Sequence, residues 1–179
     1  EGERGLMSVD PADLIADWRG SPWRKFATPW ALTHDAERAV ADLLPRLGEE
    51  FRVSAGVAIH CTATVEHGAV LKAPCVVGRD CFVAHNASMR GGVWLADKVI
   101  VGPSGEVKSS FFFAGSKVAH LSFVGDSVVG SEANIEAGAM VANYRNEFDD
   151  KLISFDFDGR TIETGVEKFG CAIGDRARV

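Results

Sequence analysis

Apolar residues recur at every sixth position through much of this chain. In steps of six from position 53 to position 113, every residue is apolar. These residues are Val53, Ile59, Val65, Leu71, Val77, Val83, Met89, Leu95, Val101, Val107 and Phe113. With 46% apolar residues overall, such a run arises by chance in a given phase roughly once in five thousand sequences, so the period is a real feature.

Small residues follow four places after most of these apolar positions. They are Val57, Ala63, Ala69, Cys75, Cys81, Ala87, Val93, Val99 and Gly105. An amphipathic helix would need three- and four-residue spacing, and a half-buried strand would need alternation, so neither explains the pattern. The pattern is typical of a triangular coil made of three hexapeptides, with aliphatic side chains inside and small residues near the corners. We therefore predict an all-β fold, a left-handed parallel β-helix of hexapeptide repeats with strands about 4.8 Å apart.

The repeat is interrupted twice. After Phe113 the next clear frame is Val129, Ile135 and Val141, two residues out of step, so we expect an irregular coil at residues 115–130. Residues 145–164 are polar and acidic, and we expect them to form a loop that leaves the β-helix, a common place for functional residues. Residues 173–179 return to the six-residue step. The predicted β-helix domain spans residues 51–179.

Residues 1–50 have a helical pattern and are predicted to form an N-terminal cap on the first coil. Thr33 is expected to cap a helix whose first turn carries Asp35 and Glu37, both favourable at that end. One apolar stripe follows, made of Ala36, Ala39, Val40, Leu43, Leu44 and Leu47. Residues 10–18 are expected to form a shorter helix. Four aromatic residues are expected to cluster between the two helices: Trp18, Trp23, Phe26 and Trp30.

Composition excludes several classes of protein. The net charge is −6 and no basic run occurs, which argues against a nucleic-acid-binding surface. No apolar stretch is long enough for a bilayer and no signal sequence is recognisable, so we expect a cytoplasmic protein with no membrane partner. The four cysteines form no CxxC pair, which favours buried thiols over disulfides or metal ligands.

Stacking of eighteen-residue coils would place three cations in one column. Lys72, Arg90 and Lys108 are eighteen residues apart, and each follows an inward aliphatic residue. Like charges about 5 Å apart repel by roughly 1 kcal/mol in water. Either the column is a solvated ladder, or an anion such as a phosphate binds between Arg90 and Lys108. The spacing leaves both interpretations open.

Histidines are the other candidates for chemistry. His67 and His85 also stack, but a metal site needs a third ligand that the sequence does not offer, so no metal is expected. His120 lies in the predicted irregular coil, flanked by Lys117 and Asp126. From position alone it is either a structural histidine or a catalytic one.

A more specific signal covers residues 107–144. The segment GSKVAHLSFVGDSVVGSEANIEAGAMVANY resembles, without a gap, the acetyltransferase domain of bacterial glucosamine-1-phosphate N-acetyltransferases. That domain is the C-terminal half of the bifunctional enzyme that makes UDP-N-acetylglucosamine. The resemblance implies a general base at His120 and phosphate-binding cations at Arg90 and Lys108. It also implies a sugar contact at Asn134, an acetyl-CoA contact at Ala137, and Asn143 and Tyr144 beside the reacting groups.

The chain departs from that family at informative places. A tyrosine that contacts phosphate in the family is Phe123 here, and the loop after Tyr144 begins RNE and is longer. No N-terminal Gly-rich nucleotide loop is present, so only the acetyltransferase part is expected. These departures leave the sugar acceptor open.

We therefore expect an acyltransferase that uses acetyl-CoA or another acyl-CoA as co-substrate. Its acceptor would be the amine of a sugar phosphate or nucleotide sugar. The alternatives are a non-catalytic β-helix scaffold or sugar-nucleotide-binding module, and a metal-dependent lyase built on the same fold. Lys108 and His120 are twelve residues apart, two sides of the triangle, so one chain is not expected to join them without help. A homotrimer, the state of the resembled family, would bring one subunit's cations to another's histidine.

Overall fold

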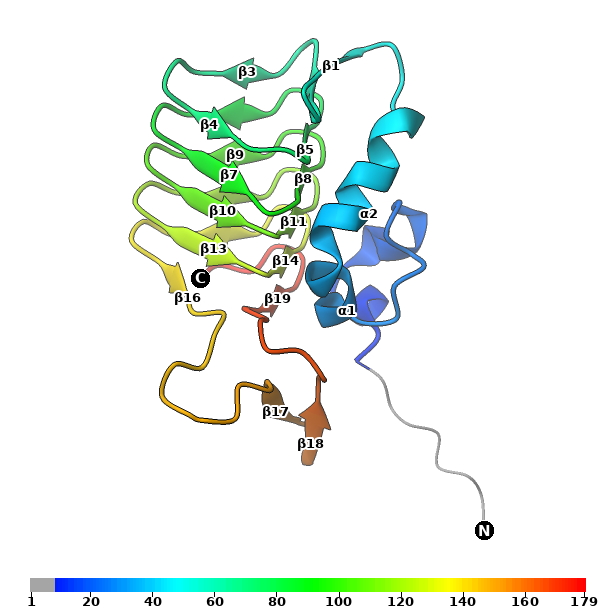
Figure 1. The fold of residues 1–179 in the computed structure, drawn as a ribbon, viewed down its shortest axis with the longest axis vertical. Helices are drawn as coiled ribbons and strands as arrows, with labels where there is room; N and C mark the ends of the chain where they lie inside the picture. Colours follow the sequence, from blue (N-terminus) through cyan, green and yellow to red (C-terminus); the bar gives the residue numbers. More distant parts are fainter. Residues whose placement is uncertain (1–8) are drawn as a thin grey trace.

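The computed structural model describes residues 9–179 and consists mainly of stacked triangular coils (Figure 1). Side A contains β2 (Val57–His60), β5 (Cys75–Val77), β8 (Val93–Leu95), β11 (Phe111–Phe112), β14 (Val128–Val129) and β19 (Ala172–Ile173). Side B contains β3 (Thr64–Val65), β6 (Phe82–Val83), β9 (Ile100–Val101), β12 (Lys117–Val118) and β15 (Asn134–Ile135). Side C contains β4 (Val70–Leu71), β7 (Ser88–Arg90), β10 (Glu106–Lys108), β13 (Phe123–Gly125) and β16 (Met140–Val141). The predicted left-handed parallel β-helix is confirmed.

The predicted interior column is right through its middle and wrong at both ends. The predicted residues from Ile59 to Val107 lie in the core between the three sides or pack against it. Val53 instead lies on β1 (Phe51–Ser54), which pairs antiparallel with β2, and it is 51% exposed. Phe113 faces outward onto the N-terminal segment, and Phe112 fills the interior in its place.

Two shortened corners explain the change of phase. Lys108 pairs with Arg90, a step of eighteen, whereas Phe111 pairs with Trp94, a step of seventeen. The corner after β10 is therefore one residue shorter than the corner after β7, and the corner after β13 is short as well. Together they produce the two-residue offset seen in the sequence.

The shortened corners turn at a single residue. The longer corner after β7 contains Gly91 and Gly92, both at positive φ, whereas the short corners turn at Ser109 (φ 47°) and Asp126 (φ 49°). Residues 115–130 therefore contain the regular strands β12, β13 and β14. The predicted irregular coil was wrong.

Within residues 9–50, the N-terminal segment contains α1 (Pro29–His34), α2 (Ala36–Leu43) and three short 3-10 turns. Thr28 caps α1, accepting a hydrogen bond from the Ala31 N–H at 3.3 Å. The predicted cap at Thr33 is wrong, because Thr33 lies inside α1 and donates to the Trp30 carbonyl. The helix expected at residues 10–18 is replaced by 3-10 turns at Pro11–Asp13 and Ala16–Gly20. No helix within residues 9–179 has the length and apolarity to cross a bilayer.

This segment lies along side A and not on the first coil (Figure 1). Its buried side chains pack on side A residues of successive coils, Ala58, Val76, Phe111 and Val128. Trp23 meets the Phe111 ring edge-on with centroids 4.8 Å apart, a contact worth about 0.5–1.5 kcal/mol beyond its buried area. The predicted aromatic cluster divides, because Trp30 packs instead on Phe155 and Phe169.

Between β16 and β19 the chain leaves the β-helix, and we call residues 142–171 the excursion. It includes the loop predicted at residues 145–164, but it contains a hairpin of β17 (Ser154–Phe157) and β18 (Arg160–Glu163). The connecting Asp158 and Gly159 both have positive φ, the geometry that tight hairpins prefer. Because Phe155 and Phe169 pack on Trp30, the excursion is anchored to the N-terminal segment.

Candidate functional site

The three stacked cations lie in one column at the edge of side C. Lys108 pairs with Arg90 in the strand register, and the Lys72 N–H bonds the carbonyl of Met89, so the predicted stacking is confirmed. Two of the cations bind carboxylates of the same chain. Arg90 donates from Nε and Nη2 to Glu106 Oε1, at 3.0 and 2.8 Å. Alternating carboxylates therefore offset the expected repulsion within the column.

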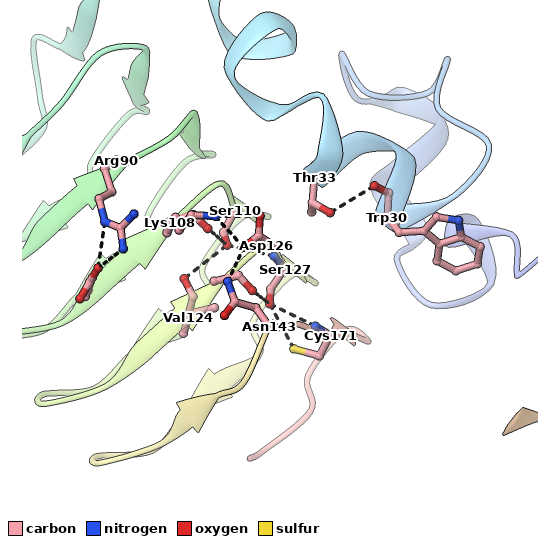
Figure 2. A network of polar contacts seen from close by, with 12 residues as sticks. Trp30, Thr33, Arg90, Lys108, Ser110, Val124, Asp126, Ser127, Asn143 and Cys171 are labelled. Carbon is pink, nitrogen blue, oxygen red and sulfur yellow. Dashed lines mark hydrogen bonds and ion pairs between the residues drawn. The ribbon is translucent and has the colours of Figure 1, made fainter. Parts of the chain in front are cut away.

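Lys108 and Asp126 form the more buried of these pairs. Lys108 Nζ lies 3.0 and 2.8 Å from the two carboxylate oxygens, and the side chains are only 18% and 5% exposed. Asn143 Nδ2 donates to the same carboxylate (Figure 2). The Asp126 carbonyl accepts the Gly170 N–H at 2.9 Å, so this corner holds both ends of the excursion.

Buried serines fix the backbone of the same corner. Ser110 Oγ donates to the Lys108 carbonyl at 2.7 Å and accepts the Ser127 N–H at 3.0 Å. Ser127 Oγ in turn accepts the Cys171 N–H at 3.2 Å, where the chain re-enters the β-helix (Figure 2). Because these groups bond one another, the corner that carries Lys108 has a defined shape before any ligand binds.

Two adjoining grooves open over this column. The smaller, of about 440 Å³, is lined by Arg90, Lys108, Phe123, Asn143, Tyr144, Glu167 and Lys168. The larger, of about 1000 Å³, shares both cations and extends to Lys72 and to the residues that join α1 to α2. The structure thus brings together four of the predicted site residues, Arg90, Lys108, Asn143 and Tyr144.

Sequence reasoning missed Glu167 and Lys168. Lys168 Nζ lies 5.9 Å from the centre of the Tyr144 ring, and Lys151 Nζ lies 5.4 Å from it. Two features of the sequence could have indicated them. The repeat resumes near Ile173, and the apolar Phe169 just before it anchors the chain where it re-enters the β-helix. Glu167 and Lys168 precede this anchor, so they lie at the corner where the excursion began, next to Lys108.

His120 lies elsewhere on the single chain. It is exposed at the corner between sides B and C and lines neither groove. Its carbonyl accepts the Gly138 N–H at 3.1 Å, which places Ala137 at the same corner of the next coil. Asn134 is on side B, where its side chain donates to Glu136. One chain therefore separates the predicted base from the predicted anion-binding cations.

The remaining ionisable groups of the described residues do not form a metal centre. Among residues 9–179 no group of three His, Cys, Asp or Glu side chains is arranged to hold a metal. The two stacked histidines are exposed, and His85 Nδ1 contacts Glu66 at 3.0 Å. Burial raises the pKa of the Cys75 thiol to about 12 and that of Cys81 to about 11. These thiols fill the interior and are poor nucleophiles.

Comparisons with known proteins give a consistent picture. No family model matches the chain. A bifunctional sugar-1-phosphate nucleotidylyltransferase/acetyltransferase of Sulfurisphaera tokodaii is 30% identical over 178 residues, 97% of this chain and 44% of that protein. The bifunctional protein GlmU of Methanococcus maripaludis is 29% identical over 157 residues, 86% of this chain and 38% of that protein. GlmU of Heliobacterium modesticaldum is 39% identical over 102 residues, 55% of this chain and 22% of that protein.

The chain therefore spans less than half the length of these relatives. Among solved structures, the acetyltransferase domain of PglB from Neisseria gonorrhoeae in complex with acetyl coenzyme A matches with a TM-score of 0.35 and 16% identity. That match covers 86% of this chain and 64% of the other, and so weak a likeness carries no argument about function. The sequence relatives confirm the resemblance: this chain is a left-handed hexapeptide-repeat β-helix homologous to the acetyltransferase region of the GlmU-like bifunctional enzymes.

Proposed function

We propose that this chain is an acetyl-CoA-dependent acyltransferase that acts on the amine of a sugar phosphate or nucleotide sugar. One observation carries the proposal. Arg90, Lys108, Asn143 and Tyr144, named from the resemblance, line one groove although up to 54 residues separate them. If the stacked cations bound no ligand, nothing would require Asn143 and Tyr144 of the excursion to lie beside them.

His120 is the proposed general base. It is exposed, and its ring has no hydrogen-bond partner among residues 9–179, so its ring nitrogens are accessible to a bound acceptor. The acceptor nitrogen attacks the thioester carbonyl, a C–N bond forms, and the C–S bond breaks. The proton lost by the nitrogen passes to His120 and then to the departing thiolate of coenzyme A.

Ala137 is the proposed contact for the thioester end of acetyl-CoA. Two neighbouring N–H groups in its turn are already used, since Gly138 donates to His120 and Ala139 donates to Glu136. Within residues 9–179 the Ala137 N–H has no acceptor, and it lies at the His120 corner. This N–H is the group in the turn that supports an oxyanion contact.

A homotrimer is the proposed assembly, because one chain holds the base and the cations apart. Packing three prisms about a three-fold axis places the B–C corner of one subunit against side C of the next. Exposed apolar side chains on these two sides and at their corner support the arrangement, namely Ile100 on side B, Val70 and Met140 on side C, and Leu121 at the corner. Asn134 would then face the acceptor from the same subunit as His120.

Replacing the base tests the proposed function. In His120→Ala, turnover of acetyl-CoA with an amino-sugar acceptor should fall by roughly 10²–10⁴ while the melting temperature is unchanged. His67→Ala is the matched control, because His67 is an exposed histidine at the same B–C edge in an earlier coil. A folded His120→Ala protein with normal turnover would remove His120 from the mechanism.

A non-catalytic sugar-nucleotide-binding module is the second candidate. The observation that favours it is that Arg90 and Lys108 already bind Glu106 and Asp126. A module of this kind would bind nucleotide sugars and release no thiol from acetyl-CoA with any amino-sugar acceptor. Release of thiol from acetyl-CoA with any amino-sugar acceptor would decide for the enzyme.

A further inference from the structure

The cation column continues one coil beyond the pair to which the sugar phosphate is assigned. Lys72 follows β4, and its backbone N–H bonds the Met89 carbonyl, so it lies directly beside Arg90. It is exposed, and it lines the larger groove together with Arg90 and Lys108. Coil spacing of about 4.8 Å makes Lys72 the next cation along the column.

Lys72 differs from the other two cations in its partners. Arg90 binds Glu106 and Lys108 binds Asp126, whereas Lys72 has no ion pair or side-chain hydrogen bond within residues 9–179. Its ammonium group therefore has three donors available for a ligand. Arg90 also keeps its Nη1 group unused by Glu106. Within the described residues, the donor groups without a partner are therefore the Lys72 ammonium and Arg90 Nη1, on neighbouring coils.

The groove around Lys72 is larger than a single phosphate requires. Its volume is about 1000 Å³, and three segments remote in sequence form its walls: residues 33–38, the side C edge, and residues 165–168 of the excursion. Gly91, in the longer corner after β7, has φ +71° and lies close against the next coil, since a Cβ there would lie 2.6 Å from Ser109 Oγ. Among the described residues, the groove thus has one cation without a protein partner, and both appended segments contribute to its walls.

From this geometry we infer that Lys72 and Arg90 hold the second phosphate of a diphosphate-linked acceptor, in a subsite walled by the N-terminal segment. The ligand class is a nucleoside diphosphate attached to the amino sugar. The inference rests on the proposed function for the identity of the acceptor, but its test needs neither acetyl-CoA nor turnover. A diphosphate is long enough to contact cations on two neighbouring coils, whereas a monophosphate contacts the cation of one coil.

Calorimetric titration of the full chain with inorganic pyrophosphate, UDP and inorganic phosphate tests the subsite, at one fixed ionic strength without added metal. Pyrophosphate and UDP should bind about tenfold or more tightly than phosphate, since each gains a charged hydrogen bond to Lys72. In Lys72→Ala this preference should disappear, and in Lys72→Arg it should return. Arg46→Ala, which removes one exposed cation from another part of the chain, should keep the preference.

Equal affinities for pyrophosphate and phosphate in the unmodified chain would overturn the subsite. So would a Lys72→Ala chain that retains the preference. Because these measurements involve no acyl donor, a protein that prefers pyrophosphate but releases no thiol would contradict the proposed enzyme and leave the subsite standing. A protein that acetylates an amino sugar without preferring pyrophosphate would contradict the subsite alone.

Discussion

At the scale of single residues, the corner that follows β10 depends on a buried ion pair. The charges of Lys108 and Asp126 compensate each other in a largely buried position. The Lys108 side chain is 18% exposed and the Asp126 side chain is 5% exposed. Removing one partner of such a pair leaves the other charge uncompensated, which costs more than the pair itself contributes. Asn143 bonds the same carboxylate, so the pair also holds the excursion at the groove.

Lys108→Ala should therefore destabilise the chain by about 3 kcal/mol, measured by urea denaturation, because it leaves Asp126 buried without its cation. Arg90→Ala is the matched control in the same column. Its pair with Glu106 is 41% exposed on each side, so its loss should cost less than about 1 kcal/mol. Equal losses in the two variants would show that burial at this corner does not set the strength of the pair.

Phe123 is the residue that most directly concerns the acceptor. It lines the smaller groove beside Arg90 and Lys108, and its ring has no hydroxyl to donate to an anion. Glucosamine-1-phosphate should therefore be a poor acceptor, and Phe123→Tyr should improve its use by roughly 10- to 150-fold in kcat/KM, the value of one charged hydrogen bond. The comparison is made at fixed acetyl-CoA. Efficient acetylation of glucosamine-1-phosphate by the unmodified chain would contradict this role for Phe123.

At the scale of elements, α2 packs directly against the longer corner after β7. A Cβ on Gly92 would lie 2.4 Å from the Ala36 carbonyl carbon and 2.6 Å from the Glu37 nitrogen, and Gly92 has φ +85°. The absence of a side chain there allows helix and corner to touch. This contact sets how closely the N-terminal segment approaches the larger groove, which Gly91 and Ala36 both line.

Gly92→Ala should lower the free energy of unfolding by about 1–3 kcal/mol, because backbone atoms block the new methyl group and the conformation is strained. Gly20→Ala is the control, since nothing lies within 4 Å of a Cβ at that position. Thermal unfolding of the two variants makes the comparison. A Gly92→Ala chain as stable as the control would show that α2 shifts without cost.

The elements also show what the sequence could predict. The interior residues from Val65 to Val107 followed from periodicity because a β-helix imposes one packing rule on every coil. The short corners did not, since a one-residue deletion changes the phase without changing composition; Phe112 and Phe113 are both apolar, and only the register distinguishes them. The first 3-10 turn was not distinguished from an α-helix because its local signals, the Asp10 cap and Pro11 after it, also fit the start of an α-helix.

The candidate site divides in the same way. Stacking and resemblance together predicted that Arg90 and Lys108 share a column. The carboxylates that bind them were not predicted, because Glu106 and Asp126 reach these cations through corner geometry that no periodicity describes. Lys168 was not predicted because it follows the β17–β18 hairpin, and the sequence does not show that the chain comes back to the groove after that hairpin.

At the scale of the whole molecule, the separation of His120 from the cation column is the dominant feature. The proposed trimer joins them across an interface and predicts that light scattering gives three chains per particle at micromolar concentration. Each copy would then contribute the B–C corner to one site and the edge of side C to another. A monomer under these conditions would contradict a shared site.

Complementation between two inactive chains tests the shared site most directly. His120→Ala and Arg90→Ala chains, mixed one to one and allowed to exchange subunits, should regain about a quarter of unmodified turnover, because a random quarter of interfaces joins an intact His120 to an intact Arg90. Each variant alone should stay inactive. Turnover that stays at the level of the separate variants, in a mixture shown by mass spectrometry to contain mixed trimers, would contradict an active site built from two chains.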